Sequence, residues 1–504
     1  IIPRIPEEGS VGASGDLTPL SYVAAVLVGE REVYWRGALR PSAEVYRELG
    51  VEPLVLRPKE GLALMNGTSV MTALACLAYA RCDYLMRLST RITALMTEAM
   101  AGNAFHFDAR LFAAKPHPGL QQIAAWLRAD LQAEALPRHS DRLQDRYSLR
   151  CAPHVIGVVA DGLPWWRQLI ENELNSANDN PLIDGEEEHV MHGGHFYGGH
   201  IAMAMDSMKT AVANLADLLD RQLAQLVDSK FNGGLPSNLS GAPDERQMIN
   251  HGFKAVQIGV SAWTAEALKQ TMPASVFSRS TECHNQDKVS MGTIAARDAL
   301  RVLTLTEQVA AACLLAAVQG VEQRLARPTP LTRPLGTALA DMVVQVRAEF
   351  APLLEDRALE PELRALIARI RQREAGAVPG AFDQLRHVGA GGRLPGQHAL
   401  DHRVQLEQLQ VAGVLQHLQQ PRVHHLGIQP FKRQEENAEC GGVRDFNVFI
   451  VDVLGFLPHH GFQLATGGGY RGGVAAGLGV LQVCIGIAGE LGVNGQPHGS
   501  ALAR

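Results

Sequence analysis

The chain has 504 residues, of which 46% are hydrophobic and 19% charged, and its formal net charge at pH 7 is −6. These values fit a soluble globular protein with a large core or several domains. No basic stripe with interleaved aromatic residues is present, which argues against a nucleic-acid partner. The 7 cysteines are scattered without a CxxC pair, which favours reduced thiols in a cytoplasmic protein.

The first residues, Ile1-Ile2-Pro3-Arg4, resemble neither a signal peptide nor a natural start, because there is no Met. We therefore expect an N-terminally truncated fragment. The nearest approach to a membrane span, residues 473–493, is glycine-rich and carries Gln482 and Glu490. A span needs about 20 predominantly apolar residues, so we expect no membrane association.

Long segments with few helix breakers predict helices at 69–100, 201–227, 289–325 and 338–373. In the first segment apolar residues recur at helical spacing, and the second is apolar around most of its circumference, which is typical of a helix buried in a bundle. The last is broken near Pro352 and Pro361. The polar motifs fall between these segments, in Gly-, Asn- and Pro-rich loops. The sequence therefore predicts a mainly α protein, a bundle of long helices with its chemistry in the connections.

Near Arg373 the composition changes: histidine, glycine and glutamine rise, and Lys432 is the last lysine. We divide the chain into a helical core, 1–375, and an extension of unassigned fold, 376–504, within which 446–456 is apolar enough for a strand or short helix. The extension is either an appended small domain or a wrong-frame translation. Its lack of periodicity favours the second interpretation. Paired histidines at 424–425 and 459–460 lack a ligand pattern of known spacing, so no metal is expected.

The tripeptide Ala13-Ser14-Gly15 can become an electrophile without any bound cofactor. If the Gly15 nitrogen attacks the Ala13 carbonyl carbon, the backbone closes into a five-membered ring. Loss of two waters, one of them carrying the Ser14 hydroxyl, leaves a 4-methylidene-imidazol-5-one. Gly15 suits this step because a residue without Cβ can approach a carbonyl at unusual backbone angles. The alternative is an ordinary loop before a helix, although the context 9–20 is far more specific than the tripeptide.

Further motifs follow in chain order: Asn66-Gly67-Thr68 and the blocks 144–151, 171–182, 194–198 and 282–292. With these motifs, the chain from Ile1 to about Glu374 resembles the aromatic amino acid lyase family. That family comprises histidine, phenylalanine and tyrosine ammonia-lyases and related aminomutases.

The resemblance implies a bundle of long antiparallel helices, assembled as a homotetramer. Active sites would be built from more than one subunit, with helix N-termini directing positive potential at them. It also implies a carbon–nitrogen lyase that uses the methylidene-imidazolone formed from Ala13, Ser14 and Gly15, with no metal or nucleotide. Attachment of the substrate amine to this electrophile makes nitrogen a better leaving group, and a base removes the β-proton.

The resemblance also assigns roles to side chains. Arg150 would bind the substrate carboxylate through its planar fork, unless it makes only a structural salt bridge. Tyr147 would hydrogen-bond near the ring or relay a proton, and Gln144 would hydrogen-bond nearby; a lone tyrosine is otherwise usually a packing residue. Asn66 would donate to the ring oxygen, which gains negative charge, or it is simply a turn residue. Phe196 would pack beside the ring.

Some positions depart from the family pattern or bear on the substrate. His195 stands where the family usually has Asn and adds a titratable group. Gln286, beside Asn285, stands where histidine ammonia-lyases usually carry Glu, whereas phenylalanine and tyrosine enzymes more often carry Gln. Because a neutral amide suits an uncharged ring better than a carboxylate does, we favour Tyr or Phe over His as the substrate. Asp16 either assists ring formation or holds the loop.

Three functional hypotheses remain open from the sequence. The first is an aromatic amino acid ammonia-lyase, and the second is a 2,3-aminomutase, which uses the same residues but retains ammonia. The third is a non-catalytic remnant, because the family's catalytic base lies on a lid loop upstream of the tripeptide. For that reason we expect little or no turnover from residues 1–504 alone.

Overall fold

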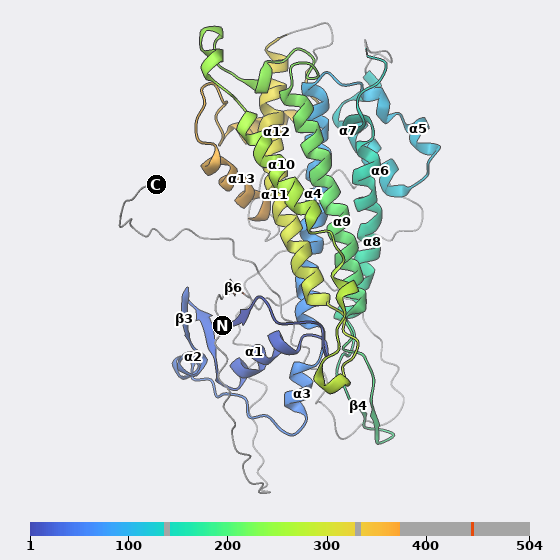
Figure 1. The fold of residues 1–504 in the computed structure, drawn as a ribbon, viewed down its shortest axis with the longest axis vertical. Coiled ribbons are helices and arrows are strands. Elements are labelled where there is room, and N and C mark those ends of the chain that lie inside the picture. The colour runs from blue at the N-terminus through green and yellow to red at the C-terminus, as the bar shows by residue number, and fades with distance from the viewer. Residues whose placement is uncertain (136–141, 328–333, 373–444, 448–504) are drawn as a thin grey trace.

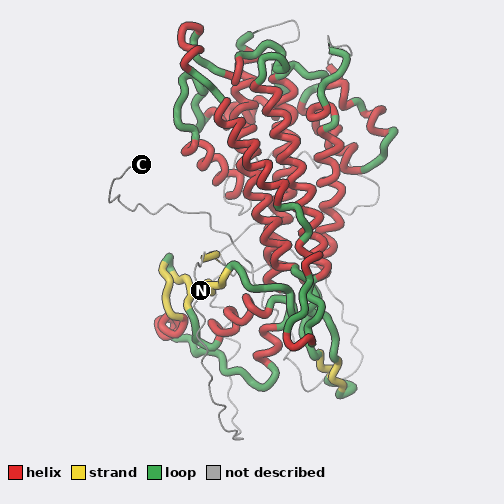
Figure 2. The backbone as a smooth tube through the Cα atoms, in the orientation of Figure 1, coloured by secondary structure: helices red, strands yellow, loops and turns green. Residues whose placement is uncertain are grey.

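The computed structural model describes residues 1–135, 142–327, 334–372 and 445–447, and it is mainly helical (Figures 1 and 2). The helices are α1 (Leu17–Leu27), α2 (Ser42–Leu49), α3 (Glu60–Met65), α4 (Ser69–Ala99), α5 (Ala109–Ala113), α6 (Pro118–Asp130), α7 (Tyr147–Arg150), α8 (Ala152–Leu174), α9 (Gly199–Val227), α10 (Lys254–Lys269), α11 (Gly292–Leu325), α12 (Thr337–Arg347) and α13 (Glu360–Gln372). The strands are β1 (Ile2–Pro6), β2 (Glu32–Trp35), β3 (Ala38–Pro41), β4 (Leu182–Asp184), β5 (His189–Met191) and β6 (Asp445–Asn447).

The helix predictions are confirmed. The segments at 69–100, 201–227 and 289–325 correspond to α4, α9 and α11, and 338–373 divides into α12 and α13. The break has a simple cause, because Pro352 lies in the connection and Pro361 occupies the first turn of α13, where a missing N–H costs nothing. The sequence analysis did not single out α8 and α10, which complete the bundle.

Successive long helices alternate in direction. α4 ends beside the segment that leads into α8, since the Asn103 N–H donates to Asp145, and α8 returns to the start of α4, where Thr68 donates to Glu173. α9 then runs back alongside α4, with Gln222 hydrogen-bonded to Thr93. As a result, α4, α9 and α11 all begin at the same end of the bundle, which lies at the bottom of Figure 1.

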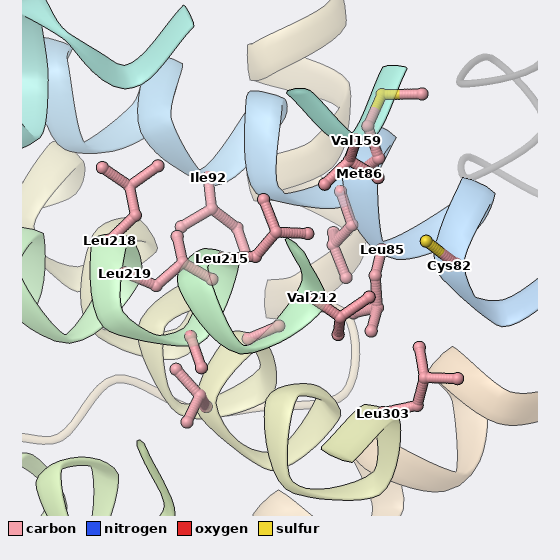
Figure 3. Packing of buried hydrophobic residues seen from close by; sticks show 14 of the residues in the cluster. Cys82, Leu85, Met86, Ile92, Val159, Val212, Leu215, Leu218, Leu219 and Leu303 are labelled. Atoms are coloured by element: carbon pink, nitrogen blue, oxygen red, sulfur yellow. The ribbon is translucent and has the colours of Figure 1, made fainter. Parts of the chain in front are cut away.

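The core of the bundle is a continuous layer of aliphatic side chains between these helices (Figure 3). Leu85 and Ile92 of α4 face Leu215 and Leu219 of α9, and all four are fully buried. A helix that is apolar on most sides must be covered by neighbours, which explains why α9 and α11 occupy the interior. This packing fixes the two ends of the bundle relative to each other.

A small antiparallel sheet, in the order β3-β2-β1-β6, lies beside the end of the bundle where α1 and α3 are found. Strand β6 belongs to the predicted extension 376–504, and it pairs with β1 through Arg4 and Asn447. The paired histidines and residues 473–493 lie outside the described residues. The division at residue 375 stays a prediction.

Within the described part of the chain, α11 is the one helix whose length and composition would allow it to cross a membrane. Of its most apolar window, 89% is buried inside the protein. That burial is what the core helix of a bundle requires.

Candidate active site

The tripeptide Ala13-Ser14-Gly15 forms a sharp bend just before α1. Gly12, Ser14 and Gly15 have φ values of 83°, 45° and 86°, and the Gly15 N–H donates to the Gly12 carbonyl at 3.3 Å. Residues other than glycine rarely adopt positive φ, so the conformation of Ser14 is held by its surroundings. A Cβ on Gly15 would lie 1.9 Å from the carbonyl oxygen of Gly67, so only glycine fits there. A bend this tight, with a bare glycine in it, fits closure of the five-membered ring.

The segment Asn66-Gly67, between α3 and α4, holds this bend from one side. The Gly67 N–H donates to the Ser14 carbonyl at 3.0 Å, and the Asp16 N–H donates to the Gly67 carbonyl at 2.7 Å. The two glycines, Gly15 and Gly67, thus pair in the manner of a short parallel bridge. The contact requires glycine at position 15, where a Cβ would clash with Gly67, whereas glycine at position 67 is favoured by its φ of 133°.

Asp16, directly after the tripeptide, is fully buried where α4 and α11 begin. Its carboxylate accepts from the Met71 N–H at 2.8 Å and from the hydroxyl of Thr293. Burial raises the pKa of Asp16 to about 6, against the lowering effect of these hydrogen bonds. The N-termini of α4 and α11 favour the ionised form of the Asp16 carboxyl. Through its hydrogen bonds to Met71 and Thr293, Asp16 joins the tripeptide to both helices.

The three helices that begin at this end approach one another very closely. A Cβ on Gly198, before α9, or on Gly292, at the start of α11, would lie 2.1 or 2.4 Å from the sulfur of Met71 on α4. The positive ends of three helix dipoles therefore converge beside the tripeptide, as the family resemblance implied.

Gln286 reaches the tripeptide from the loop before α11. Its side-chain nitrogen donates to the Ser14 hydroxyl oxygen at 2.9 Å, although the two residues are 272 positions apart. The hydroxyl of Thr281 donates to the Gln286 side-chain oxygen at 3.1 Å, which fixes the orientation of the amide. Asn285, on the same loop, is exposed.

Asn66 is 8% exposed, and its amide is held by the loop after α8. The Asn66 side-chain nitrogen donates to the Asn180 carbonyl at 2.9 Å and to the Asp179 carboxylate at 3.3 Å. Asp179 in turn forms an ion pair with Lys59. The sequence predicted that the Asn66 amide would donate to the oxygen of the methylidene-imidazolone ring, but its N–H groups point to residues 179–180 instead. Among the described residues, the Asn66 side-chain oxygen has no hydrogen-bond partner.

Phe196 and His195 lie in the connection between β5 and α9. This connection reaches the same end of the bundle, because Gly198 abuts Met71 and Thr68. Phe196 is partly buried and His195 is exposed. Gln286 thus contacts the tripeptide Ala13-Ser14-Gly15 directly, Asn66 is brought there by its neighbour Gly67, and the Phe196 loop lies alongside.

The block containing Gln144, Tyr147 and Arg150 lies at the opposite end of the bundle (Figure 1). Tyr147 is 72% exposed, and the Arg150 guanidinium lies over its ring at 4.6 Å from the centroid. The Arg150 Nε also donates to the Asp145 carbonyl at 2.9 Å. Gln144 is exposed.

The separation between the two groups follows from the length of α4. Gly67 touches the tripeptide just before α4 begins, whereas Asp145 accepts from the Asn103 N–H just after it ends. The 31 residues of α4, at about 1.5 Å each, span roughly 46 Å. Within one chain, Tyr147 and Arg150 therefore cannot reach Ser14.

Several residues with clear positions in this site were given no role in the sequence analysis, although Glu173 and Asp179 lie within the block 171–182. Lys59, Asp179 and Thr281 contact Asn66 or Gln286 directly or through one partner, and Glu173 accepts from the Thr68 hydroxyl at 2.6 Å. Their distance along the chain hides them, because only folding brings the loops at 59, 179 and 281 together. Among the described residues, no group of three or more His, Cys, Asp or Glu side chains is arranged to hold a metal ion.

Comparison with known proteins identifies the class to which this fold and site belong. The family model described as aromatic amino acid lyase matches residues 1–348. The chain belongs to the aromatic amino acid lyase family, whose ammonia-lyases are carbon–nitrogen lyases.

Individual relatives differ in their named reactions. The chain is 39% identical over 380 residues to a histidine ammonia-lyase of Caenorhabditis elegans, covering 73% of this chain and 54% of that one. It is 38% identical over 391 residues to a tyrosine ammonia-lyase of Cereibacter sphaeroides, covering 74% of this chain and 73% of that one. The chain thus spans about half the length of the nematode relative.

Solved structures agree with the fold. The histidine ammonia-lyase of Trypanosoma cruzi matches with a TM-score of 0.68 and 32% identity, over 77% of this chain and 70% of that one. A tyrosine aminomutase of Streptomyces globisporus matches with a TM-score of 0.68 and 35% identity, over 78% and 75%. The mainly helical bundle is therefore the fold of this family.

Proposed function

We propose that this protein is an ammonia-lyase acting on an aromatic L-amino acid, with Tyr or Phe favoured over His. The electrophile is a methylidene-imidazolone formed from Ala13, Ser14 and Gly15. The observation that carries the proposal is the bend itself: positive φ at Ser14 and Gly15, and a glycine pressed against Gly67 where no Cβ fits. Formed there, the ring supplies an electrophile that makes the substrate's amine a better leaving group.

The preference for an uncharged ring rests on Gln286. Its amide lies against Ser14 and is oriented by Thr281, so a neutral donor faces the reacting position. A carboxylate there would attract an imidazolium, whereas an amide makes no charge-assisted pair. The relatives include both histidine and tyrosine enzymes at similar identity, so the chemistry at Gln286 is the ground for this choice.

The active form proposed here is a homotetramer. Tyr147 and Arg150 lie about one α4 length from Ser14 in their own chain, yet Tyr147 is exposed and held in place. In an antiparallel assembly the α7 end of a second copy would stand beside the Ser14 end of the first. Arg150 would then bind the substrate carboxylate as a bidentate pair, and Tyr147 would move a proton near the ring. We propose a cytoplasmic location for this assembly.

A 2,3-aminomutase is the second candidate, because a tyrosine aminomutase is among the structures with the same fold and 35% identity. Both reactions need the same electrophile and differ in whether ammonia is retained until it returns to the β-carbon.

The experiment that tests the proposal combines mass and product analysis on the full chain. Loss of two waters from the peptide containing Ala13-Ser14-Gly15 supports the electrophile, and an unmodified mass overturns it. With Tyr, Phe and His as substrates, free ammonia with an aryl acrylate identifies a lyase, and a β-amino acid identifies an aminomutase. A preference for His would overturn the interpretation of Gln286, and the absence of turnover from dehydrated protein would support the non-catalytic alternative.

A further inference from the structure

Lys59 is a charged residue that the reaction chemistry leaves unused, yet it lies one contact away from the site. It stands directly before α3 with φ of 77°, in the left-handed region, and forms an ion pair with Asp179, 120 residues further along the chain. A lysine in this backbone conformation costs roughly 1–2 kcal/mol, so the surroundings must hold it there.

The ion pair itself adds little to stability. Its side chains remain 31% and 26% exposed, and pairs with this much solvent contact contribute on the order of 0–1 kcal/mol. The value of the contact therefore lies in where it places the Asp179 carboxylate. One oxygen of that carboxylate meets Lys59, and the other accepts from the Asn66 side-chain nitrogen at 3.3 Å.

The placement of Asn66 in turn bears on the tripeptide. Asn66 is followed by Gly67, whose N–H and carbonyl bond to Ser14 and Asp16 on either side of the bend. With its nitrogen tied to Asp179 and Asn180, the Asn66 side chain has one possible amide orientation. The series of contacts Lys59–Asp179–Asn66–Gly67 thus reaches the Ser14 carbonyl and the Asp16 N–H, which flank Gly15, the residue whose nitrogen attacks in ring closure.

We propose that Lys59 is a positioning residue: through Asp179 it fixes the amide of Asn66, and with it Gly67, against the Ala13-Ser14-Gly15 bend. This inference rests on the proposed function and deepens it, because it names what holds the bend ready for cyclisation. Lys59 touches neither the substrate nor the ring and acts only through Asp179.

The test uses the full chain and follows the loss of two waters from the tripeptide over time by intact mass and peptide mapping. Lys59→Met should slow the dehydration about tenfold, which corresponds to roughly 1.4 kcal/mol. Lys59→Arg keeps the charge and should stay within about threefold of the wild type, since less than 1 kcal/mol separates them. Arg57→Met is the matched control: it removes a charge two residues away, from an exposed side chain, and should leave the rate unchanged.

A charge-swapped double variant, Lys59→Asp with Asp179→Lys, separates positioning from a merely structural ion pair. The swap restores opposite charges but leaves no acceptor at position 179 for Asn66, so dehydration should stay slow. Recovery of the wild-type rate in the swap, or a wild-type rate in Lys59→Met, would overturn the proposal.

Crystal structures of the wild type and of Lys59→Met separate a failure of the Lys59 proposal from a failure of the proposed function. If the wild type itself loses no water, the proposed function fails, and the structures still decide the role of Lys59. Displacement of the Asn66 amide from Asn180 in the variant supports it, and an unmoved amide overturns it.

Discussion

The two ends of the helical bundle differ in what each contributes and in what each lacks. The end at which α4, α9 and α11 begin brings together the tripeptide, Asn66 and Gln286 from three distant parts of the chain. The other end presents the exposed Tyr147 and the half-buried Arg150 on the short helix α7. One end holds the residues proposed to form an electrophile, and the other holds the groups proposed to bind the substrate carboxylate and to move a proton. The bundle between them keeps these halves apart within one chain, which is the ground for proposing a site built from two chains.

The largest expected effect comes from a substitution in the tripeptide, at the end of the bundle where α4, α9 and α11 begin. Ser14→Ala removes the hydroxyl that leaves as water and the oxygen to which Gln286 donates. We expect complete loss of dehydration and of any turnover. Intact mass measures the first and product analysis the second. Dehydration of the variant would show that the ring is not built at Ser14.

Mixing two inactive variants, one altered at each end of the bundle, tests whether the two ends of different chains form one site. Ser14→Ala lacks the electrophile, and Arg150→Met lacks the carboxylate-binding group, so each alone should be inactive. The wild-type chain itself is expected to show little turnover. After joint refolding in equal amounts, random assembly of sites from two copies should restore about a quarter of that wild-type turnover. No recovery in verified mixed oligomers would mean that both groups act within one chain. Mixing Ser14→Ala with Asn66→Ala, defective at the same end, is the matched control and should stay inactive.

The core that separates the ends can be weakened without touching either one. Ile92 is fully buried in the C-terminal third of α4, and Ile92→Ala should lower the free energy of unfolding by about 3 kcal/mol through lost burial and a residual cavity. Denaturant unfolding measures this change. Val344→Ala, at a 67% exposed position on α12, should stay within about 0.5 kcal/mol of the wild type. Equal losses in both variants would contradict the assigned core.

An effect of at most similar size, seen only as a dependence on pH, is expected at the end of the bundle that holds the tripeptide. The pKa of Asp16 is raised to about 6 by burial, above its unfolded value of 3.8. Between these values the folded protein holds a proton that the unfolded chain releases. The stability supplied by this carboxyl is therefore present below about pH 4 and falls, by up to roughly 3 kcal/mol, as the pH rises to about 6. In melting experiments, the stability of Asp16→Asn relative to the wild type should rise across this window, and parallel pH profiles would contradict it.

The sequence by itself determined the fold class and the main helices. A stripe or full circumference of apolar residues at helical spacing leaves a long segment little choice but to be buried as a helix, and α4, α9 and α11 follow their predicted ranges closely. Proline decided the break between α12 and α13 for an equally local reason. The tripeptide and the need for a bare glycine at Gly15 were also readable, because they depend on covalent chemistry.

Only the tertiary structure decided which of the candidate residues meet. Gln286 reaches Ser14 from 272 residues away, and Asn66 turns its amide toward Asp179 and Asn180. Such contacts depend on how packed helices orient their loops, and no local spacing encodes that. Ser14 and Arg150 lie apart because α4, a rigid helix roughly 46 Å long, stands between the two ends of the bundle. It places two motifs of one family at opposite ends of the bundle, and this is the reason for proposing that the site is shared between copies.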